Sequence, residues 1–516
     1  AQTFWHRVLP FIFLFFIVST AYLNADHEEF IFDSRLPLID NPEDTVNVNK
    51  IIKLFWEGKL NPDAPFAFLT FALNYKFNTA IGLDGFDITT FLVFNIIIHA
   101  LNACLLYILV RSFLGYLKPD EEPGIFIPLA AATLFAVHPI AASSVAYIIQ
   151  RRGSLATMFY LLAILSYLRV RYYPQFQKLR ADTAKDKSDK KISPWPWQRI
   201  FLVAIIPVLY WFSFRSKNLG VVLPFAILAI EFCLRATNRR ALLRYLAVLI
   251  PGGMVCVIGM FFFLWIRGLF DPATMTVHHF GPETPWGPWY HFLTEARVFF
   301  HYWKLLLLPL PMWSCIDHGF ELSTHLLHHG SIIAIGLHAI LFVLAIVAAL
   351  RGYTLGAIGF FWFYVALIPY AALPQIELFV EYKTYLPSIG VALILAEVLC
   401  RIRHRISINK QASVVAIVAT LLLITTVYRN HIYRDRFHAW GDAVKKSPNH
   451  ARPHVNFGNA LVRKGESELQ KGKKAEADKH FKEAKGHYER AIEIRPGYPE
   501  AHIHYGNMLV LEGKYD

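Results

Sequence analysis

The chain has 516 residues, of which 55% are hydrophobic and only 17% are charged, and its formal net charge is +13. This composition is too apolar for a soluble globular protein, and the apolar residues form long continuous runs, which predict membrane-spanning helices. The cations lie between these runs, where they orient a membrane protein, so the positive charge does not indicate a nucleic-acid-binding protein.

We expect about eleven membrane-spanning helices, because a helix of about 20 apolar residues crosses the hydrocarbon core. Loops rich in Lys and Arg mark the cytoplasmic side, and the most basic loops begin near Leu168, Arg235 and Arg401. Counting spans places these loops on the side of the N-terminus, which predicts a cytoplasmic N-terminus and an external C-terminus. The expected spans are 8–24, 88–112, 124–139, 144–168, 199–214, 218–234, 245–266, 331–350, 354–373, 385–400 and 411–428.

Two further segments are expected to lie along the outer membrane surface. If residues 295–313 crossed the membrane, the basic loop at 401–410 would move outside, so we assign them to an interfacial helix that ends at Pro309 and Pro311. A full span is the alternative. The first external loop, residues 25–87, mixes aromatic residues with cations, which predicts that it folds against the membrane.

The tail is charged and polar, and two of its passages resemble each other. "PNHARPHVNFGNALV" begins at Pro448 and "PGYPEAHIHYGNMLV" begins at Pro496. Their small and large apolar residues have the spacing of tetratricopeptide repeats, which usually bind peptides or proteins. Gly458 and Gly506 are 48 positions apart instead of about 34, so about 14 extra residues are expected near 463–481.

The sequence therefore predicts an all-α protein with two parts. Residues 1–428 are expected to form the polytopic membrane domain, and residues 429–516 are expected to form a tetratricopeptide α-solenoid. Because a solenoid needs about three repeats, we expect the chain to stop inside its next repeat.

Asp33 is the candidate for chemistry in the first external loop. In "FIFDSR" it follows alternating apolar residues, which are expected to hold the backbone at the membrane surface. A fixed carboxylate there suits a general base that deprotonates a hydroxyl group, and Arg35 can keep it ionised. The other carboxylates of the loop are interpreted as solvated charge.

A second candidate site consists of cations at the turns on the external side. Positive charge on this side is not needed to orient the protein in the membrane. Each of these cations can anchor the chain to lipid headgroups, but several short turns on one face also suit a lipid phosphate. The candidates are Arg152, Arg215, Lys217 and Lys383.

Three other features are candidates for polar or metal sites. His138 can form part of a polar site or simply end its helix, and Glu381 is a further polar candidate. The histidines at 325, 328 and 329 are more typical of a structural role than of a metal site. No metal ligands are therefore assigned, although the need for a divalent metal is left open.

Taken in order, four motifs resemble the transmembrane and tetratricopeptide O-mannosyltransferases of the C-type glycosyltransferase superfamily, and their bacterial relatives. "FIFDSRLPLIDNP" resembles the Phe-Val-Tyr-Asp-Asp loop of that family. "AVHPIAASSVAYIIQRRGSLATMFYLLA" resembles its His-Pro-Ile and Gly-Arg-Ala-Asp segment. "FRSKNLGVVLPFAILAIE" and "EYKTYLPSIGVALILA" resemble its Ser-Lys-Glu and Glu-Arg-x-x-Tyr-Leu-Pro-Ser segments.

The resemblance implies an inverting glycosyltransferase without a tightly bound cofactor. Such enzymes transfer a sugar from a polyprenyl-phosphate carrier to Ser or Thr of an exported protein, and Asp33 takes the position of the carboxylate at the acceptor. Ser34, Tyr382 and Asn218 stand where the family has Asp, Arg and Glu.

The alternative is a non-catalytic, membrane-anchored tetratricopeptide scaffold that binds an exported protein assembly. The chain has no Asn-x-Ser/Thr sequon, which favours a bacterial inner membrane with the repeats in the periplasm.

Overall fold

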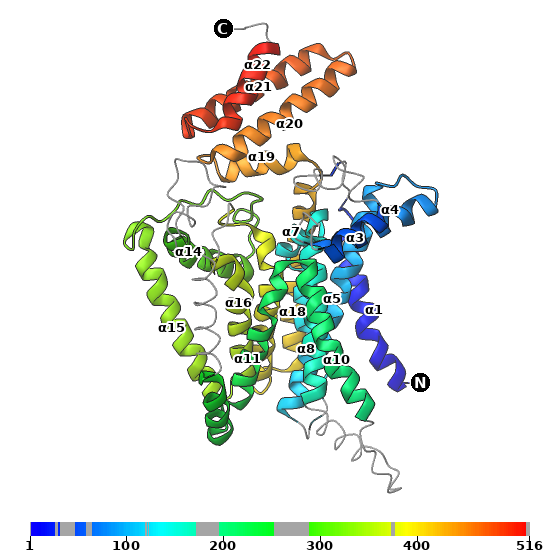
Figure 1. Ribbon diagram of the computed structural model, residues 1–516, viewed down its shortest axis with the longest axis vertical. Coiled ribbons are helices and arrows are strands. Elements are labelled where there is room, and N and C mark those ends of the chain that lie inside the picture. Colours follow the sequence, from blue (N-terminus) through cyan, green and yellow to red (C-terminus); the bar gives the residue numbers. More distant parts are fainter. Residues whose placement is uncertain are drawn as a thin grey trace.

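In the computed structural model, a bundle of long helices carries a smaller stack of helices at one end (Figure 1). The structure describes residues 2–25, 29–30, 47–57, 64–118, 121, 123–171, 196–251, 288–372 and 377–511. These residues contain helices and no strands, so the predicted all-α class is confirmed.

Within the described residues, the bundle includes ten named helices. They are α1 (Gln2–Tyr22), α5 (Ile88–Leu117), α6 (Phe126–Ala136), α8 (Arg151–Arg171), α10 (Pro196–Ser216), α11 (Leu223–Arg235), α15 (Ser331–Leu350), α16 (Thr354–Ala372), α17 (Tyr385–Ile402) and α18 (Ile408–Ile432). Further elements lie near the end of the bundle that faces the small stack (Figure 1). These elements are α3 (Val48–Glu57), α4 (Pro65–Ala80), α7 (Ala142–Val145), α14 (Pro288–Leu307), η3 (Pro139–Ala141), η4 (Ile148–Gln150), η5 (Asn218–Val222), η6 (His328–Gly330) and η7 (Glu381–Thr384).

Multiple apolar helices confirm a polytopic membrane protein. Within the described residues, seven helical stretches are long and apolar enough to cross a membrane, and an eighth is added if the bent pair 126–136 and 139–145 counts as one span. The apolar helices Arg7–Tyr22 and Ile200–Ser216 are shorter. Most of the expected span at 245–266 lies outside the described residues. The total of eleven therefore stays a prediction.

The segment expected to lie at the membrane surface forms α14, which ends at Leu307, before Pro309 and Pro311. A proline inside a helix removes a backbone donor and clashes with the preceding turn, so the helix cannot continue through this pair. Among the described helices, α14 is not one of the candidate spans.

The helix that begins with α6 breaks at His138 and Pro139 with a bend of 47°. The His138 backbone is extended, and its ring Nδ1 accepts a hydrogen bond from the Ile140 N–H at 3.2 Å. The chain then passes through η3, α7 and η4 before α8 begins. Asn95 of α5 fixes this passage, because its side-chain amide donates to the carbonyls of Val145 and Ile148.

The small stack consists of four helices, which we call the tail helices: α19 (Arg436–Lys446), α20 (Ala451–Gln470), α21 (Lys474–Ile494) and α22 (Pro499–Leu511). A Cβ atom at Gly458 would lie 2.5 Å from the Tyr488 ring, and one at Gly465 would lie 2.7 Å from the Phe481 ring. These pairings run in opposite directions along the chain, so α20 and α21 are antiparallel. The absence of a side chain at each glycine lets the facing ring pack against the helix backbone.

The extra residues expected near 463–481 do not form a loop, because α20 continues to Gln470 and α21 already begins at Lys474. The residues predicted as an insertion therefore lie in the last part of α20 and the first part of α21. This packing agrees with the predicted helical hairpins, but the assignment to tetratricopeptide repeats and the boundary at residue 428 stay predictions.

Hydrogen bonds connect the tail helices to the segment that follows α14. Lys446 donates to the Ser314 carbonyl at 2.7 Å, and the Ser447 hydroxyl donates to the Asp317 carbonyl at 3.1 Å. The Gly319 N–H donates to the Ser447 hydroxyl oxygen at 3.2 Å, and Cys315 is buried in the core of the tail helices. The two parts therefore share a packed interface.

Candidate functional site

Three cations from distant parts of the sequence lie together at the end of the bundle that faces the tail helices. Arg152 is in the first turn of α8, Lys217 immediately precedes η5, and Lys383 is in η7. We call these three residues the cation cluster. The charges of Arg152 and Lys383 both act on Lys217. Because these like charges repel one another, a bound anion would stabilise the cation cluster.

A sharp turn between α10 and η5 positions Lys217. A Cβ atom at Gly220 would lie 2.4 Å from the Phe214 backbone nitrogen, so the turn requires glycine. The Lys217 ammonium donates to Gln150 Oε1 at 3.2 Å and lies 4.7 Å from the centroid of the Tyr382 ring. Burial, followed by the charges of Arg152 and Lys383, lowers the pKa of Lys217 to about 7. This lysine therefore changes charge near neutral pH.

Lys383 is held by backbone oxygens. Its ammonium donates to the carbonyls of Glu377 and Leu378 and lies 5.2 Å from the centroid of the Tyr370 ring. Only 3% of the residue is exposed. Neutral carbonyls orient the ammonium without removing its charge, so Lys383 still contributes positive charge to the cluster.

Several buried polar atoms in or near the cation cluster have no hydrogen-bond partner in the described part of the chain. Among the described residues, Arg152 Nε, His291 Nδ1 and both carboxylate oxygens of Glu295 have no hydrogen-bond partner. Burial raises the pKa of Glu295, and the charge of Lys383 opposes this rise. Buried polar atoms are costly unless a ligand or water satisfies them. These atoms suit a polar, charged ligand.

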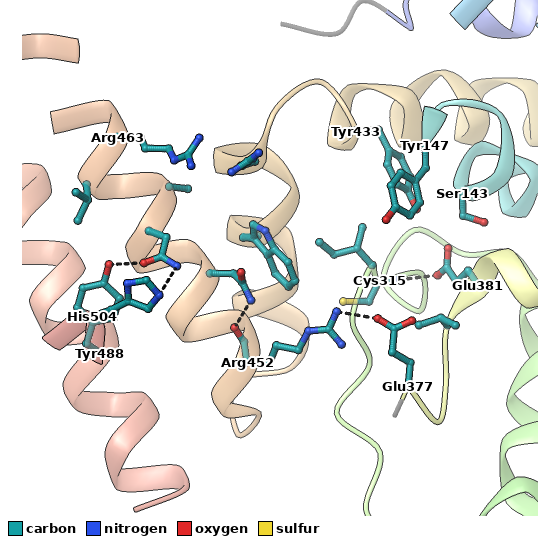
Figure 2. A pocket seen from close by; sticks show the side chains of 18 of the residues that line it. Ser143, Tyr147, Cys315, Glu377, Glu381, Tyr433, Arg452, Arg463, Tyr488 and His504 are labelled. Carbon is teal, nitrogen blue, oxygen red and sulfur yellow. Dashed lines mark hydrogen bonds and ion pairs between the residues drawn. The ribbon is translucent and has the colours of Figure 1, made fainter. Parts of the chain in front are cut away.

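A cavity of about 730 Å³ lies between this end of the bundle and the tail helices (Figure 2). Glu377, Tyr382 and Arg452 contribute to its wall. The Glu377 carboxylate accepts hydrogen bonds from Arg452 Nη2 and from the Tyr382 hydroxyl, each at 2.8 Å. The Tyr382 ring also lies 4.7 Å from the Lys217 ammonium, so Tyr382 contacts both the cavity and the cation cluster. The volume is typical of a ligand pocket.

The start of the predicted first external loop contacts a residue that lines the same cavity. Arg436, which lines the cavity, donates its backbone N–H to Glu29 Oε1 at 3.1 Å, and its guanidinium lies 3.3 Å from Glu29 Oε2. The guanidinium also donates to the Phe30 carbonyl at 3.3 Å. The predicted catalytic Asp33 and its neighbours Ser34 and Arg35 follow directly in the sequence and lie outside the described residues.

Glu381 lies in a buried ion pair. Its Oε2 accepts from Arg429 Nη2 at 2.7 Å. Its Oε1 accepts from the Cys315 N–H at 2.7 Å, a bond that Figure 2 shows. The side chains of Arg429 and Glu381 are 0% and 2% exposed. A third contact comes from His318 Nε2, 3.3 Å from Oε1. These contacts connect η7, α18 and the segment after α14.

His138 and Arg215 occupy other positions. The ring of His138 donates from Nε2 to the Leu306 carbonyl at 3.1 Å and accepts at Nδ1, so both ring nitrogens are used. Arg215 is half-buried in the last turn of α10, two residues before Lys217. Their predicted roles stay predictions.

In the ranges that the structure describes, no group of three or more His, Cys, Asp or Glu residues is arranged to hold a metal ion. His325, His328 and His329 stack ring on ring, with centroids 5.1 Å and 3.8 Å apart.

Sequence reasoning missed Arg452, Glu377, Arg429 and Glu295. No motif distinguishes Arg452 from the other cations of the tail, and its contact with Glu377 spans 75 positions. A charged residue near the end of an apolar run was an available signal for Arg429, because such a residue needs a buried partner. For Glu295 the sequence predicts only a place in the interfacial helix.

Comparison with known proteins supports the resemblance seen in the motifs. Over most of its length the chain is homologous to proteins named protein O-mannosyl-transferases. It is 25% identical to TMTC4 of Homo sapiens over 487 residues, 25% identical to TMTC4 of Mus musculus over 517 residues, and 23% identical to F38B6.6 of Caenorhabditis elegans over 506 residues.

These alignments cover 85%, 90% and 93% of the chain, respectively. The chain spans only 62–64% of the length of these relatives. No family model and no solved structure matches the chain. The predicted resemblance to this group of glycosyltransferases is confirmed.

Proposed function

We propose that the chain is a membrane glycosyltransferase that transfers a sugar from a polyprenyl-phosphate carrier to Ser or Thr of an exported protein. The cation cluster carries the proposal, because it gathers Arg152, Lys217 and Lys383 from three segments and leaves Arg152 Nε without a partner among the described residues. Such a site suits the phosphate of the donor. The names of the relatives favour mannose as the sugar.

The proposed reaction is an inverting displacement. The acceptor hydroxyl oxygen attacks the anomeric carbon as the bond from that carbon to the phosphate oxygen breaks, and the polyprenyl phosphate leaves with the bonding electron pair. Asp33 takes the hydroxyl proton as general base. The cation cluster stabilises the charge that develops on the leaving phosphate.

The position of the first external loop supports this role for Asp33. The loop leaves the described region at Phe30, whose carbonyl is bonded to the cavity-lining Arg436. Asp33 is three residues further along, and three residues span at most about 11 Å. The base is therefore proposed to act at the cavity, where the tail helices would present the acceptor chain.

The deciding experiment measures transfer by the full chain in lipid nanodiscs, with radiolabelled polyprenyl-phosphate mannose and a peptide rich in Ser and Thr. Asp33→Asn is expected to abolish transfer without changing thermal stability. Lys217→Met is expected to raise the donor KM by about tenfold or more, the equivalent of about 1.4 kcal/mol.

Lys304→Met is the matched control, because Lys304 is also on this face and lies 3.9 Å from the centroid of the Trp313 ring. It is expected to leave transfer unchanged. A wild-type chain that binds the peptide but never transfers sugar would support the scaffold alternative. Transfer that survives Asp33→Asn would rule out the assigned base.

The proposal includes a topology in the bacterial inner membrane, with the N-terminus in the cytoplasm and the tail helices in the periplasm. Single cysteines placed at exposed Lys471 and exposed Arg403 should react with an impermeant thiol reagent in intact cells at the first position only. The reverse pattern would contradict this topology.

A further inference from the structure

We propose that Arg452, on tail helix α20, is a positioning residue that keeps the cation cluster available to an anion by holding the Glu377 carboxylate away from it. This inference rests on the proposed function, in which the cluster binds the phosphate of the donor. It assigns the tail helices a part in donor binding in addition to presenting the acceptor.

The contacts form a continuous chain from the tail to the cluster. Arg452 Nη2 donates to Glu377 Oε1 at 2.8 Å, and the Tyr382 hydroxyl donates to Glu377 Oε2 at 2.8 Å. The Tyr382 ring then lies 4.7 Å from the Lys217 ammonium. Figure 2 shows Arg452 reaching across the cavity to Glu377. Both carboxylate oxygens are thus directed at partners outside the cluster.

Glu377 is a strong competitor for the cluster if it is released. Burial favours its neutral form, but Arg452, then Tyr382 and Lys383, together lower the pKa of Glu377, so it is ionised at neutral pH. Its charge already acts on Lys217 and Lys383. Without Arg452, the carboxylate keeps only the Tyr382 hydroxyl among these two partners, and the positive charge that still attracts it is that of these lysines. An internal carboxylate on the lysines would oppose the binding of a phosphate.

Arg452 is not needed to attach the tail helices. Lys446 and Ser447 bond to the carbonyls of Ser314 and Asp317 independently of it. Arg452 does have a second carboxylate nearby, since its Nε lies 3.5 Å from Asp317 Oδ2. Asp317 therefore provides a control, because it contacts the same arginine at the same interface and is not part of the path through Tyr382.

The test measures equilibrium binding of radiolabelled polyprenyl-phosphate mannose to the full chain in nanodiscs, with thermal unfolding recorded for each variant. Arg452→Ala is expected to weaken binding by about five- to tenfold, the lower range of couplings between sites. The double variant Arg452→Ala/Glu377→Gln is expected to recover wild-type affinity to within about twofold, because the competing charge has been removed. Asp317→Asn is expected to bind as the wild type does.

Recovery in the double variant distinguishes positioning from a structural role, since loss of packing would not be repaired by a second substitution. Unchanged affinity in Arg452→Ala, or a double variant as weak as the single one, would overturn the inference while leaving the proposed function standing. A wild-type chain that fails to bind the probe would instead overturn the proposed function, and the inference with it.

Discussion

Arg151 and Arg152 are neighbours in the sequence, yet the structure uses them in opposite ways. Arg151 is fully buried and donates to Asn95 Oδ1 at 2.7 Å, to Asn74 Oδ1 at 2.9 Å and to the Phe91 carbonyl at 2.8 Å. Arg152 is only half-buried, and its Nε has no partner among the described residues. A satisfied buried cation holds helices together, whereas an unsatisfied cation beside other cations is available to a ligand.

The largest effect is expected for Arg151→Ala. The substitution leaves the Oδ1 atoms of Asn95 and Asn74 buried without a donor and removes the stacking of the guanidinium on the Phe71 ring, 4.4 Å away. We expect the free energy of unfolding to fall by about 3–5 kcal/mol. Thermal unfolding of the purified variant in detergent measures it. An Arg151→Ala variant as stable as the wild type would contradict the structural role that distinguishes Arg151 from Arg152.

Glu381→Gln tests a buried carboxylate whose two oxygens both have partners, at a residue that the sequence presents as a possible site residue. It leaves the Arg429 guanidinium buried without its carboxylate. Removing one member of a buried ion pair is strongly destabilising, and we expect a loss of about 3 kcal/mol. If the variant keeps its stability but loses sugar transfer, Glu381 acts on the ligand instead.

Arg152→Ala should show the opposite behaviour to Arg151→Ala. We expect the melting temperature to change little, while binding of polyprenyl-phosphate mannose weakens by about tenfold, or about 1.4 kcal/mol. The two arginine variants are best measured side by side, with stability and binding recorded for each. If Arg152→Ala lowers the melting temperature and leaves donor binding normal, Arg152 has a structural role and does not bind the donor.

The smallest expected effect is a pH dependence of donor binding. The folded-state pKa of Lys217 is lowered to about 7, so Lys217 is charged below this pH and loses its proton as the pH rises through it. The phosphodiester of the donor keeps its single charge over this range. We therefore expect affinity to fall by about fivefold between about pH 6 and pH 8.

Lys217→Arg provides the control for this pH dependence, because a guanidinium stays protonated throughout the range. Its binding curve is expected to be flat with pH. The same decline in the arginine variant would show that another group is responsible.

Much of the membrane part could be predicted from local sequence. Residues 88–112, 331–350 and 411–428 are expected spans, and each lies within a long apolar helix. Alternation of the spans also placed Arg152, Lys217 and Lys383 on one face, and the structure brings them together. Their role with a lipid phosphate stays a prediction.

The connection from the tail to this site was not predictable. The contact between Arg452 and Glu377 depends on how α20 packs against the bundle, and no periodicity records that orientation. The form of the insertion near 463–481 was also undecided, because extra residues can form a loop or extend the two helices, and their packing across Gly465 and Phe481 settles the choice.

The sequence by itself determined where the helices run, because an apolar segment in lipid must satisfy its backbone hydrogen bonds internally. It also determined which turns carry positive charge. Only the tertiary structure decided which of those charges are satisfied. Successive residues of a helix point about 100° apart, so Arg151 faces the amides of α4 and α5 while Arg152 is directed to Lys217 and Lys383. Partners from other elements then set the role of each arginine.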